Sequence, residues 1–494
     1  MRMKSIDSLP FTHSFGALPA AFHTRLMPTP LAAPYLVCSS PAVARLIGLD
    51  PDELTRPAAI EALAGNRVPQ GAAPLAAVYS GHQFGVWAGQ LGDGRAILLG
   101  GVATSTGTLE LQLKGAGPTP YSRMGDGRAV LRSSIREFLC SEAMAGLGIP
   151  TSRALCVTGS KQLVMREAPE SVAVATRVAP SFVRFGSFEH WYYKDRPVEL
   201  QQLADYVIDH FYPELRSGEH AQGNPYRALL SEVSRRTAVM IAHWQAVGFM
   251  HGVMNTDNMS ILGLTIDYGP FGFMEAFDAG HICNHTDQQG RYAFHRQPEI
   301  GQWNCYALGQ ALLPLIGSLE ETTDALAVYQ PTFMQTLDTL FHAKLGLLTQ
   351  APQDKALIDD LLALLQANHT DYPLFWRRLG DLQIDQPQAD APLRDLFLDR
   401  PAFDQWAQRY RSRLQSEQSR DPARKQQMDR VNPKYVLRNY LAQIAIEKAQ
   451  NGDFSEVAKL LSVLENPYDE HPDHAAYAAL PPDWANDLEV SCSS

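Results

Sequence analysis

The sequence predicts an α+β protein of two lobes, the first rich in strands and the second mostly helical. From residue 76 to about residue 114, short apolar runs are broken by glycines, which is typical of strands and tight turns. After about residue 190 the apolar residues recur mostly at helical spacing, and beyond about residue 320 the chain is helical throughout. This change along the chain is the basis of the predicted fold class.

Composition excludes several classes of protein. The chain has 494 residues, of which 45% are hydrophobic, so it can bury a substantial core and is not a disordered polymer. At roughly 100–200 residues per domain, this length predicts about three domains or one elaborated enzyme. The 42 basic and 53 acidic residues give a net charge of −11, which argues against a general binder of nucleic acid or of an anionic membrane.

The termini and the cysteines indicate a cytoplasmic protein. No apolar run approaches the roughly 18–20 residues that a membrane span needs. The first ten residues are not followed by the apolar segment of a signal peptide. Six cysteines are scattered along the chain without a close pair, which suits a reducing compartment better than a disulfide scaffold.

Changes in composition and in the spacing of apolar residues divide the chain into four predicted regions. An extension without strong periodicity comes first, and the body that follows has a strand-rich and then a helical lobe. A helical region with a Pro- and Asp-rich tail completes the chain. The four regions are residues 1–75, 76–190, 191–335 and 336–494.

A glycine-rich turn opens the strand-rich lobe. The predicted strands Val86–Ala88 and Ala96–Leu99 flank the segment Gly89–Arg95. Glycines without a Cβ let backbone N–H groups approach phosphate oxygens closely. Taken alone, most such segments are only tight turns.

A lysine and a glutamate follow this turn. Residues 109–114 alternate strictly, so Leu109, Leu111 and Leu113 share one face of a strand while Lys114 lies on the other. A helix predicted to open at Ser133 carries Glu137 off its apolar stripe, suited to pair with Lys114. Each of the two could alone be an ordinary solvated residue, but a lysine in this place can also reach a phosphate. The apolar stripe comprises Ile135, Phe138, Leu139 and Ala143.

Two polar segments flank an apolar pattern in the second lobe. A helical stripe through Val233, Met240, Trp244 and Val247 stops at Gly248, and the segment 251–258 follows it. Residues 259–267 are predicted to form a hairpin that ends at Asp267. Asn258 and Asp267 on either side of this hairpin can share one hard cation, because Mg²⁺ usually takes one or two such oxygen ligands.

In this order the five features match the protein-kinase series of glycine loop, strand lysine, helix glutamate, catalytic loop and metal-binding aspartate. Asn258 and Asp267 are in register with the metal ligands of that series. Val253 stands where a kinase has its catalytic aspartate, and valine cannot accept a proton. Asp257 is the nearest carboxylate that could replace it. His251 is expected to hold backbone carbonyls of this loop.

These segments, together with others along the chain, resemble the SelO (selenoprotein O, or YdiU) family of protein adenylyltransferases. The resemblance covers nearly the whole chain and extends to its last residues. The matching strings are Gly81-His82-Gln83-Phe84-Gly85, Leu113-Lys114-Gly115-Ala116-Gly117, Asp126-Gly127-Arg128, Asn255-Thr256-Asp257-Asn258-Met259, Asp267-Tyr268-Gly269-Pro270-Phe271-Gly272-Phe273, Asn432-Pro433-Lys434 and Cys492-Ser493-Ser494.

The resemblance implies a pseudokinase-like fold that binds ATP in the reverse sense to ordinary kinases and transfers AMP to protein hydroxyls, releasing pyrophosphate. It implies Asp257 as proton acceptor, Asn258 and Asp267 on Mg²⁺ or Mn²⁺, and Glu137 as support for Lys114. Its expected partners are ATP and proteins that carry Ser, Thr or Tyr hydroxyls. ATP contacts are implied at Gly92, Gly94, Arg95, Lys114, Asp126, Gly127, Arg177, Arg184 and Asp267.

The residue types agree with that chemistry. Transfer at the α-phosphorus needs charge compensation along the triphosphate, which Lys114, Arg177 and Arg184 can supply together with a metal ion. Arg177 and Arg184 lie in apolar, strand-like segments, where an arginine needs a charged partner.

Two hypotheses concern Cys283. The alternation of His281, Cys283 and His285 could hold zinc, although a polar loop is the simpler interpretation. The resemblance adds a redox hypothesis, because some family members carry selenocysteine in the place of Cys492. In this hypothesis Cys283 and Cys492 form a reversible disulfide; the alternative is an inert cysteine in the tail.

Two other functions stay open at this point. A kinase of proteins or small molecules could use Asp257 as its base. The valine at position 253 also fits a catalytically inactive scaffold that binds ATP. The protein substrates, the preferred hydroxyl and the oligomeric state are not predicted.

Overall fold

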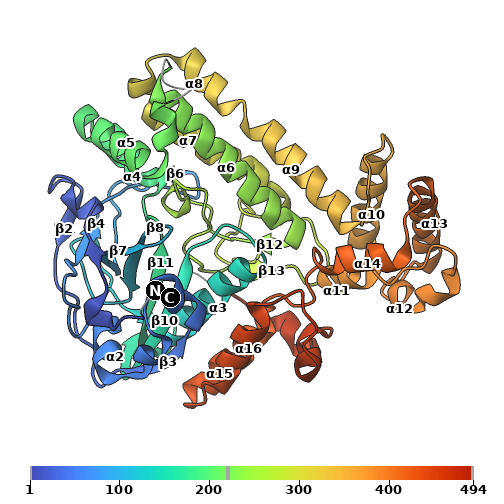
Figure 1. The fold of residues 1–494 in the computed structure, drawn as a ribbon, viewed down its shortest axis with the longest axis horizontal. Helices are drawn as coiled ribbons and strands as arrows, with labels where there is room; N and C mark the ends of the chain where they lie inside the picture. Colours follow the sequence, from blue (N-terminus) through green and yellow to red (C-terminus); the bar gives the residue numbers. More distant parts are fainter. Residues whose placement is uncertain (1–2, 218–222, 491–494) are drawn as a thin grey trace.

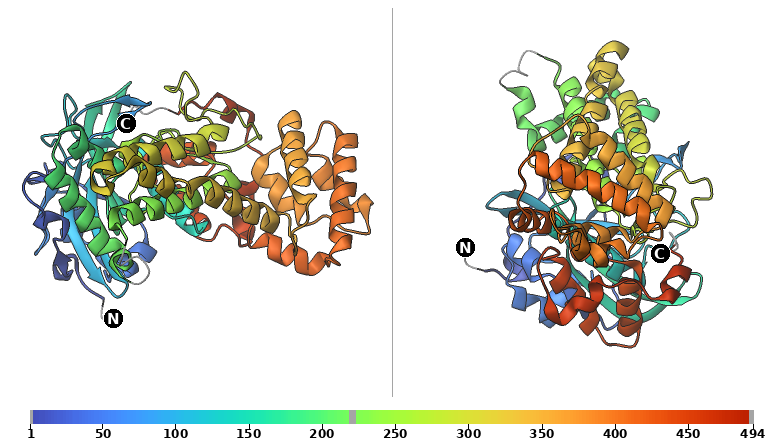
Figure 2. Two further views of the ribbon diagram at one scale, coloured as in Figure 1. Left: turned by 90° about the horizontal axis from the view of Figure 1, so that it is seen from above. Right: turned by 90° about the vertical axis from the view of Figure 1, so that its right-hand side faces the viewer.

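The computed structural model of the chain describes residues 3–217 and 223–490. It combines one large antiparallel sheet with many helices (Figure 1). The sheet lies at one end of the molecule and the helices of residues 354–429 gather at the other, as Figure 1 and the left-hand view of Figure 2 show. The predicted mixture of a strand-rich part followed by a helical part is confirmed.

The main sheet contains nine strands, and its neighbours pair antiparallel. Strands from the first 77 residues take part in it beside strands from residues 96–179. The order along the sheet is β2 (His23–Arg25), β4 (Leu75–Ala77), β7 (Ala96–Thr104), β8 (Gly107–Lys114), β11 (Pro169–Ala179), β10 (Arg153–Met165) and β3 (Tyr35–Ser39), with β1 (Phe11–Thr12) beside β7 and β9 (Ala129–Val130) beside β11.

Strand β8 follows the predicted alternation. Leu111 and Leu113 are fully buried in a core shared with α1 (Pro41–Leu46) and α2 (Pro57–Leu63). Glu110 and Gln112, on the opposite face, are buried as well. The sheet is therefore covered on both faces, and its polar face turns toward the interior of the molecule.

The two predicted strands that flank the glycine-rich turn do not pair with each other. Strand β6 (Val86–Trp87) pairs with β5 (His82–Gln83) and not with β7. The reason lies in the two residues between β5 and β6, Phe84 and Gly85, which have φ angles of 50° and 81°. Two consecutive positive φ angles favour a tight two-residue hairpin, so the chain turns back before the glycine-rich segment begins.

Helix α3 (Leu131–Gly146) lies against β10 and β11 and begins two residues before the predicted start. Its predicted apolar stripe is confirmed, since Ile135, Phe138, Leu139 and Ala143 are at most 1% exposed. The helices α15 (Asn439–Gln450) and α16 (Ser455–Leu464) pack on α3 from the other end of the sequence (Figure 1).

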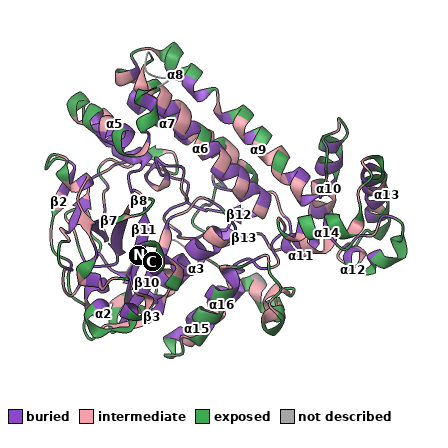
Figure 3. Ribbon diagram, viewed as in Figure 1, coloured by how far each residue is buried: buried purple, intermediate pink, exposed green. Residues whose placement is uncertain are grey.

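A second group of helices surrounds α6 (Pro225–Val247). Val233, Met240 and Trp244 of its predicted stripe are buried, Val247 is half-buried, and the helix ends at Gly248 as predicted. The buried stretches of this helix face its neighbours (Figure 3). These neighbours are α5 (Pro197–Phe211), α7 (Gln297–Ile316), α8 (Leu319–Leu326) and α9 (Tyr329–Lys344), and α4 (Phe185–Tyr193) packs in turn on α7 and α5.

The predicted hairpin over residues 259–267 does not form as two strands. A single antiparallel bridge joins Met259 and Thr265. The backbone of this segment pairs with other parts of the chain instead: Ile261 donates to the Val183 carbonyl at 3.1 Å and Thr265 to the Pro150 carbonyl at 2.9 Å. These partners use the hydrogen-bonding groups that a hairpin would need.

The region beyond residue 320 is helical, as predicted. A separate apolar core holds together the helices at the far end of the molecule. None of the helices in residues 3–217 and 223–490 is long and apolar enough to cross a membrane. The helices at the far end are α10 (Asp354–Asn368), α11 (Tyr372–Leu379), α12 (Ala391–Arg394), α13 (Arg400–Ser416) and α14 (Asp421–Asp429).

Candidate active site

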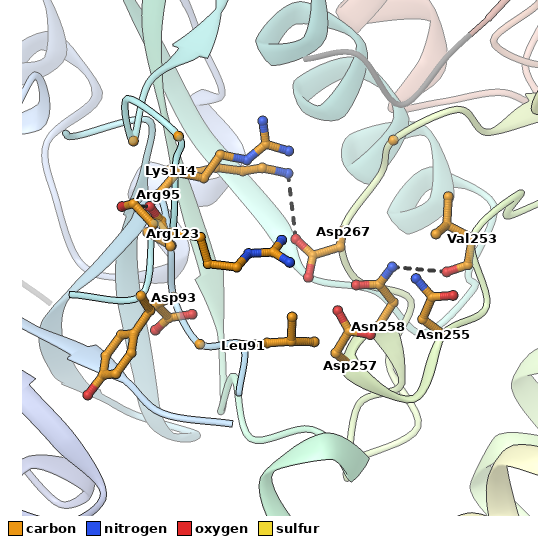
Figure 4. Close-up of a pocket in the computed structure, with 18 of the residues that line it drawn as sticks. Leu91, Asp93, Arg95, Lys114, Arg123, Val253, Asn255, Asp257, Asn258 and Asp267 are labelled. Atoms are coloured by element: carbon orange, nitrogen blue, oxygen red, sulfur yellow. Dashed lines mark hydrogen bonds and ion pairs between the residues drawn. The ribbon is translucent and has the colours of Figure 1, made fainter. Parts of the chain in front are cut away.

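A cavity of about 810 Å³ lies between the polar face of the sheet and the loops that follow α6 (Figure 4). Eleven residues to which the sequence assigns a role in nucleotide binding, metal binding or catalysis line it. They are Gly92, Gly94, Arg95, Lys114, Asp126, Gly127, Arg177, Arg184, Asp257, Asn258 and Asp267. Glu137 lies behind this lining, on α3.

The predicted pair of Lys114 and Glu137 is confirmed. Lys114 is the last residue of β8, and its Nζ lies 2.7 Å from Oε2 of Glu137 and 3.5 Å from Oδ1 of Asp267. Burial lowers the pKa of Lys114, and the two carboxylates act in the opposite direction. The lysine is thus held at the cavity wall by a glutamate from the neighbouring helix.

Asp267 is the centre of a cationic cluster. Its Oδ1 accepts a hydrogen bond from Arg177 Nη1 at 2.5 Å, and its Oδ2 accepts one from Arg184 Nη1 at 2.7 Å. Burial alone would raise the pKa of this carboxyl, but Arg177, Arg184 and Lys114 hold it well below its ordinary value. Asp267 also has a φ of 57°, a left-handed conformation of the kind that clusters at functional sites.

Arg177 and Arg184 have the charged partners that their apolar surroundings require. Arg177 also lies 3.3 Å from Glu137, and Arg184 donates to the backbone carbonyl of Asp257 at 2.7 Å. The guanidinium of Arg184 lies 4.5 Å from the ring centre of Tyr79, in a cation–π contact. One carboxylate thereby orients two arginines at the base of the cavity.

Asp257 lies in a single 3₁₀ turn, Thr256–Asn258, and is 8% exposed. Its Oδ2 accepts a hydrogen bond from Gln83 Nε2 at 3.2 Å. Its Oδ1 has no hydrogen-bond partner within residues 3–217 and 223–490. Burial raises the pKa of Asp257 to about 6, although the charge of Arg184 acts against this.

The loop before Asp257 is held by side chains. His251 donates from Nε2 to the Ile266 carbonyl at 2.9 Å, which confirms the role expected for it. Asn258 Nδ2 donates to the Val253 carbonyl at 3.0 Å, and Oδ1 of Asn255 accepts from the Tyr292 hydroxyl at 2.6 Å. These bonds fix the backbone on both sides of the candidate base.

The glycine-rich side of the cavity packs tightly. A Cβ on Gly94 would lie 2.9 Å from the Tyr121 carbonyl oxygen, so a side chain would force the two segments apart. Asp126 accepts two hydrogen bonds from Arg166, each of 2.9 Å. The hydrogen bond from Arg166 lowers the pKa of Asp126. Asp126 therefore borders the cavity as an ionised, paired carboxylate.

Sequence reasoning gave no role to several lining residues, among them Gln83, Arg123 and Arg166. Gln83 lies in one of the strings that carry the resemblance, and that was its only signal. Arg166 meets a carboxylate 40 positions earlier in the chain, and no local pattern reveals such a contact.

Within the described parts of the chain, no three His, Cys, Asp or Glu side chains come together as a metal site. The zinc alternative at residues 281–285 therefore gains no support.

Cys283 is buried, and its thiol donates to the Met250 carbonyl at 3.7 Å. Cys492 lies outside the described residues. Val490, two residues before it, accepts a hydrogen bond from the backbone N–H of His285 at 3.3 Å.

Comparisons with known proteins agree with the motifs. A family model described as protein adenylyltransferase SelO matches residues 5–465. The chain is 69% identical over 493 residues to a protein of Herminiimonas arsenicoxydans named protein nucleotidyltransferase YdiU, with 99% of this chain and 98% of the relative covered. A protein of the same name from Dechloromonas aromatica (strain RCB) is 59% identical, with both chains covered completely. Another from Burkholderia multivorans (strain ATCC 17616 / 249) is 57% identical, covering 98% of this chain and 96% of the relative.

Proposed function

Because the chain belongs to the SelO family of protein adenylyltransferases, we propose that it transfers AMP from ATP to Ser, Thr or Tyr hydroxyls of other proteins and releases pyrophosphate. The chain is a nucleotidyltransferase. The observation that supports AMP transfer to protein hydroxyls is that one cavity is lined by the candidate base, the candidate metal ligands and the cationic cluster.

The proposed architecture is that of a two-lobed pseudokinase. In it, residues 76–190 form the first lobe, with β8 and α3 carrying the lysine–glutamate pair, and residues 191–335 form the second. Residues 1–75 and 336–494 are the extension and the helical region that flank this body. The contact of 2.7 Å between Lys114 and Glu137 supports the assignment, since the kinase series needs this pair.

The triphosphate of ATP is proposed to lie against Lys114, Arg177 and Arg184. Arginine suits this task because its planar guanidinium can hold two phosphate oxygens at once. Arg95 adds a further cation to the cavity lining. Gly92, Gly94 and Gly127 line the same space, where their lack of a Cβ lets neighbouring segments of the chain approach closely, and Asp126 borders it.

Asn258 and Asp267 fit a hard divalent cation. The Asn258 side chain uses its Nδ2 on the Val253 carbonyl, so its Oδ1 is the atom left for a ligand. Asp267 is held in its ionised form by three cations. Both oxygens suit Mg²⁺ or Mn²⁺, which when bound would supply charge compensation for the phosphates.

Asp257 is proposed to orient and deprotonate the incoming hydroxyl. The hydroxyl oxygen attacks the α-phosphorus, the bond from this phosphorus to the bridging oxygen breaks, and pyrophosphate leaves. The proton passes to Asp257, whose Oδ1 has no other partner in the described parts of the chain while Gln83 holds Oδ2. Most of the rate enhancement then comes from positioning and electrostatics.

The test compares ATP labelled at the α-phosphate with ATP labelled at the γ-phosphate, together with the intact mass of the acceptor protein. Transfer of AMP labels the acceptor from the α position only. Asp257→Asn should retain ATP binding and lose labelling, because the amide cannot take the proton. Asp195→Asn is the matched control, since Asp195 is exposed and its φ of 53° suits asparagine.

Each alternative has its own signature in this assay. Label from the γ position with the mass of one phosphate would identify a kinase. Tight ATP binding without label from either position would identify an inactive scaffold. Full labelling by Asp257→Asn would remove Asp257 from the role of base.

We also propose that Cys283 and Cys492 form a reversible disulfide that restrains the loop after Asp267. The contact between His285 and Val490 supports it, because each of these residues is two positions from one of the cysteines. Peptide mapping of the oxidised protein without reductant should recover the linked pair in wild type and lose it in Cys283→Ser. Free thiols at both positions under oxidising conditions would end this proposal.

A further inference from the structure

A tight turn at the rim of the cavity carries Arg123. The backbone N–H of Gly125 donates to the Ser122 carbonyl at 2.8 Å, which closes a four-residue turn with Arg123 at its second position. Arg123 has a φ of 55°, in the left-handed region that side chains other than glycine, asparagine and aspartate rarely adopt. Such backbone strain persists only where the surroundings hold it, and it clusters at ligand clamps.

The base of this turn is anchored to the glycine-rich segment. Thr119 Oγ1 donates to the Asp93 carbonyl at 2.7 Å, and the backbone N–H of Thr119 donates to Ser122 Oγ at 2.8 Å. Ser122 Oγ in turn donates to the Gly94 carbonyl. The anchored base fixes the direction of the turn, while its tip at Arg123 and Met124 is exposed.

Arg123 differs from the other cations of the cavity in its pairing. Lys114 is paired with Glu137, Arg166 with Asp126, and both Arg177 and Arg184 with Asp267. Arg123 takes part in no ion pair or hydrogen bond with residues 3–217 or 223–490. Its side chain extends from the turn into the cavity, toward Asp267 (Figure 4).

We propose that the Arg123 guanidinium binds the phosphate chain of the bound nucleoside triphosphate, on the side opposite Lys114 and the Asp267 cluster. This inference rests on the function proposed above, because that function brings ATP into the cavity. The charge of an arginine without a carboxylate partner is fully available to a phosphate, and its planar guanidinium can donate hydrogen bonds to two phosphate oxygens at once. Arg123 would then stabilise the charge that develops on the leaving pyrophosphate.

The test uses two substitutions that respect the strained backbone. Arg123→Asn removes the charge and places there a residue that tolerates a positive φ. Arg123→Lys keeps the charge but loses the planar guanidinium that can hold two phosphate oxygens at once. Loss of a charge-assisted hydrogen bond should weaken ATP binding by Arg123→Asn about tenfold or more. The Kd of adenosine, measured by competition with labelled ATP, should not change, and Arg123→Lys should lie between wild type and Arg123→Asn.

Arg45→Met serves as the control, because Arg45 is exposed on α1 outside the cavity and should bind ATP as wild type does. Wild-type ATP affinity in Arg123→Asn would overturn the inference. An equal loss of affinity for ATP and adenosine would also overturn it, since that outcome indicates a distorted cavity.

The failure of this inference can be told from the failure of the proposed function. If wild type labels acceptors from the α-phosphate while Arg123→Asn binds and transfers normally, only the role of Arg123 is lost. If wild type transfers no AMP but its ATP affinity depends on Arg123, the phosphate contact stands and the proposed function falls.

Discussion

Two aspartates of the cavity, ten positions apart, have opposite protonation tendencies. Burial acts to raise the pKa of both Asp257 and Asp267. Around Asp267 three cations overcome this effect, whereas Asp257 receives one hydrogen bond from Gln83 and keeps a raised pKa of about 6. A carboxylate whose pKa lies well below its ordinary value, beside one whose pKa is raised to about 6, fits a division into a charge-binding group and a proton acceptor.

At the scale of single residues, Lys344 predicts a pH dependence of stability. Its side chain is buried near the rings of Trp376 and Tyr372, at 4.5 and 5.8 Å from their centres, and no carboxylate of the described residues pairs with it. Burial lowers the pKa of Lys344 from 10.5 to about 7. The unfolded chain therefore binds more protons than the folded protein between about pH 7 and about pH 10, so stability should rise with pH in this range.

Lys344→Met should remove that dependence. Below about pH 7 Lys344 carries a proton in both the folded and the unfolded state, and the folded protein bears the full cost of the buried charge. A pKa lowered to about 7 corresponds to about 5 kcal/mol, and the lost cation–π contact offsets about 2 kcal/mol, so the variant should be more stable there by about 3 kcal/mol. The gain should shrink as the pH approaches 10. Urea unfolding at several pH values checks this, with the exposed Lys459→Met as control. An equal difference at every pH would contradict the role of the charge.

At the scale of elements, three segments pack closely together at the candidate base. The backbone N–H of His82 in β5 donates to Thr256 Oγ1 at 2.7 Å, and that of Ser80 donates to the Gly186 carbonyl at 3.0 Å. Gly186 belongs to the first turn of α4, and a Cβ there would lie 2.0 Å from the Ser80 carbonyl oxygen and 3.4 Å from Cα of Asp257. The position of the candidate base thus depends in part on a close backbone approach at Gly186.

Gly186→Ala should therefore disturb both stability and activity. The added methyl group must push apart α4 and the segment at Ser80, which overpacking data place at about 1–3 kcal/mol. Thermal unfolding and the α-phosphate labelling assay measure the two effects. Gly280→Ala is the control, because the nearest atom to a Cβ there is the tip of Asp278 at 3.5 Å. An unchanged melting temperature and rate would show that the backbone adjusts freely.

At the scale of the molecule, the described part of the C-terminal third supports the site from outside, and none of its described residues lines the cavity. Helices α15 and α16 pack on α3, which carries Glu137. Arg438, just before α15, is 2% exposed and donates to both oxygens of Asp371 at 2.8 and 3.0 Å. It also pairs with Glu275, in the segment after Asp267. Arg438 thereby joins the start of α11, the start of α15 and the segment after Asp267.

Arg438→Met should weaken the whole assembly. Removing the arginine leaves the buried carboxylate of Asp371 and the half-buried carboxylate of Glu275 without their cation, and breaking a buried pair in this way costs about 3–5 kcal/mol in comparable cases. Urea unfolding followed by fluorescence checks the loss. Arg430→Met, at an exposed position, should change little. Equal stability of the two variants would show that the pair does not join these parts.

The sequence by itself determined the features that depend on neighbours along the chain. The alternation of residues 109–114, the stripe of α3 and the end of α6 at Gly248 all follow from local periodicity and local backbone preference. The order of the motifs was enough to predict the pair of Lys114 and Glu137, which the structure brings to 2.7 Å.

Only the tertiary structure decided which distant groups meet. Strand β6 forms a hairpin with β5 rather than joining β7, and the segment after Met259 forms hydrogen bonds with other loops instead of the predicted hairpin, because tertiary packing decides which backbone partners meet. Arg177 meets Asp267 across 90 positions, and Gln83 meets Asp257 across 174. Contacts of this separation form only when the sheet and the helices close on each other, so no pattern within one segment could reveal them.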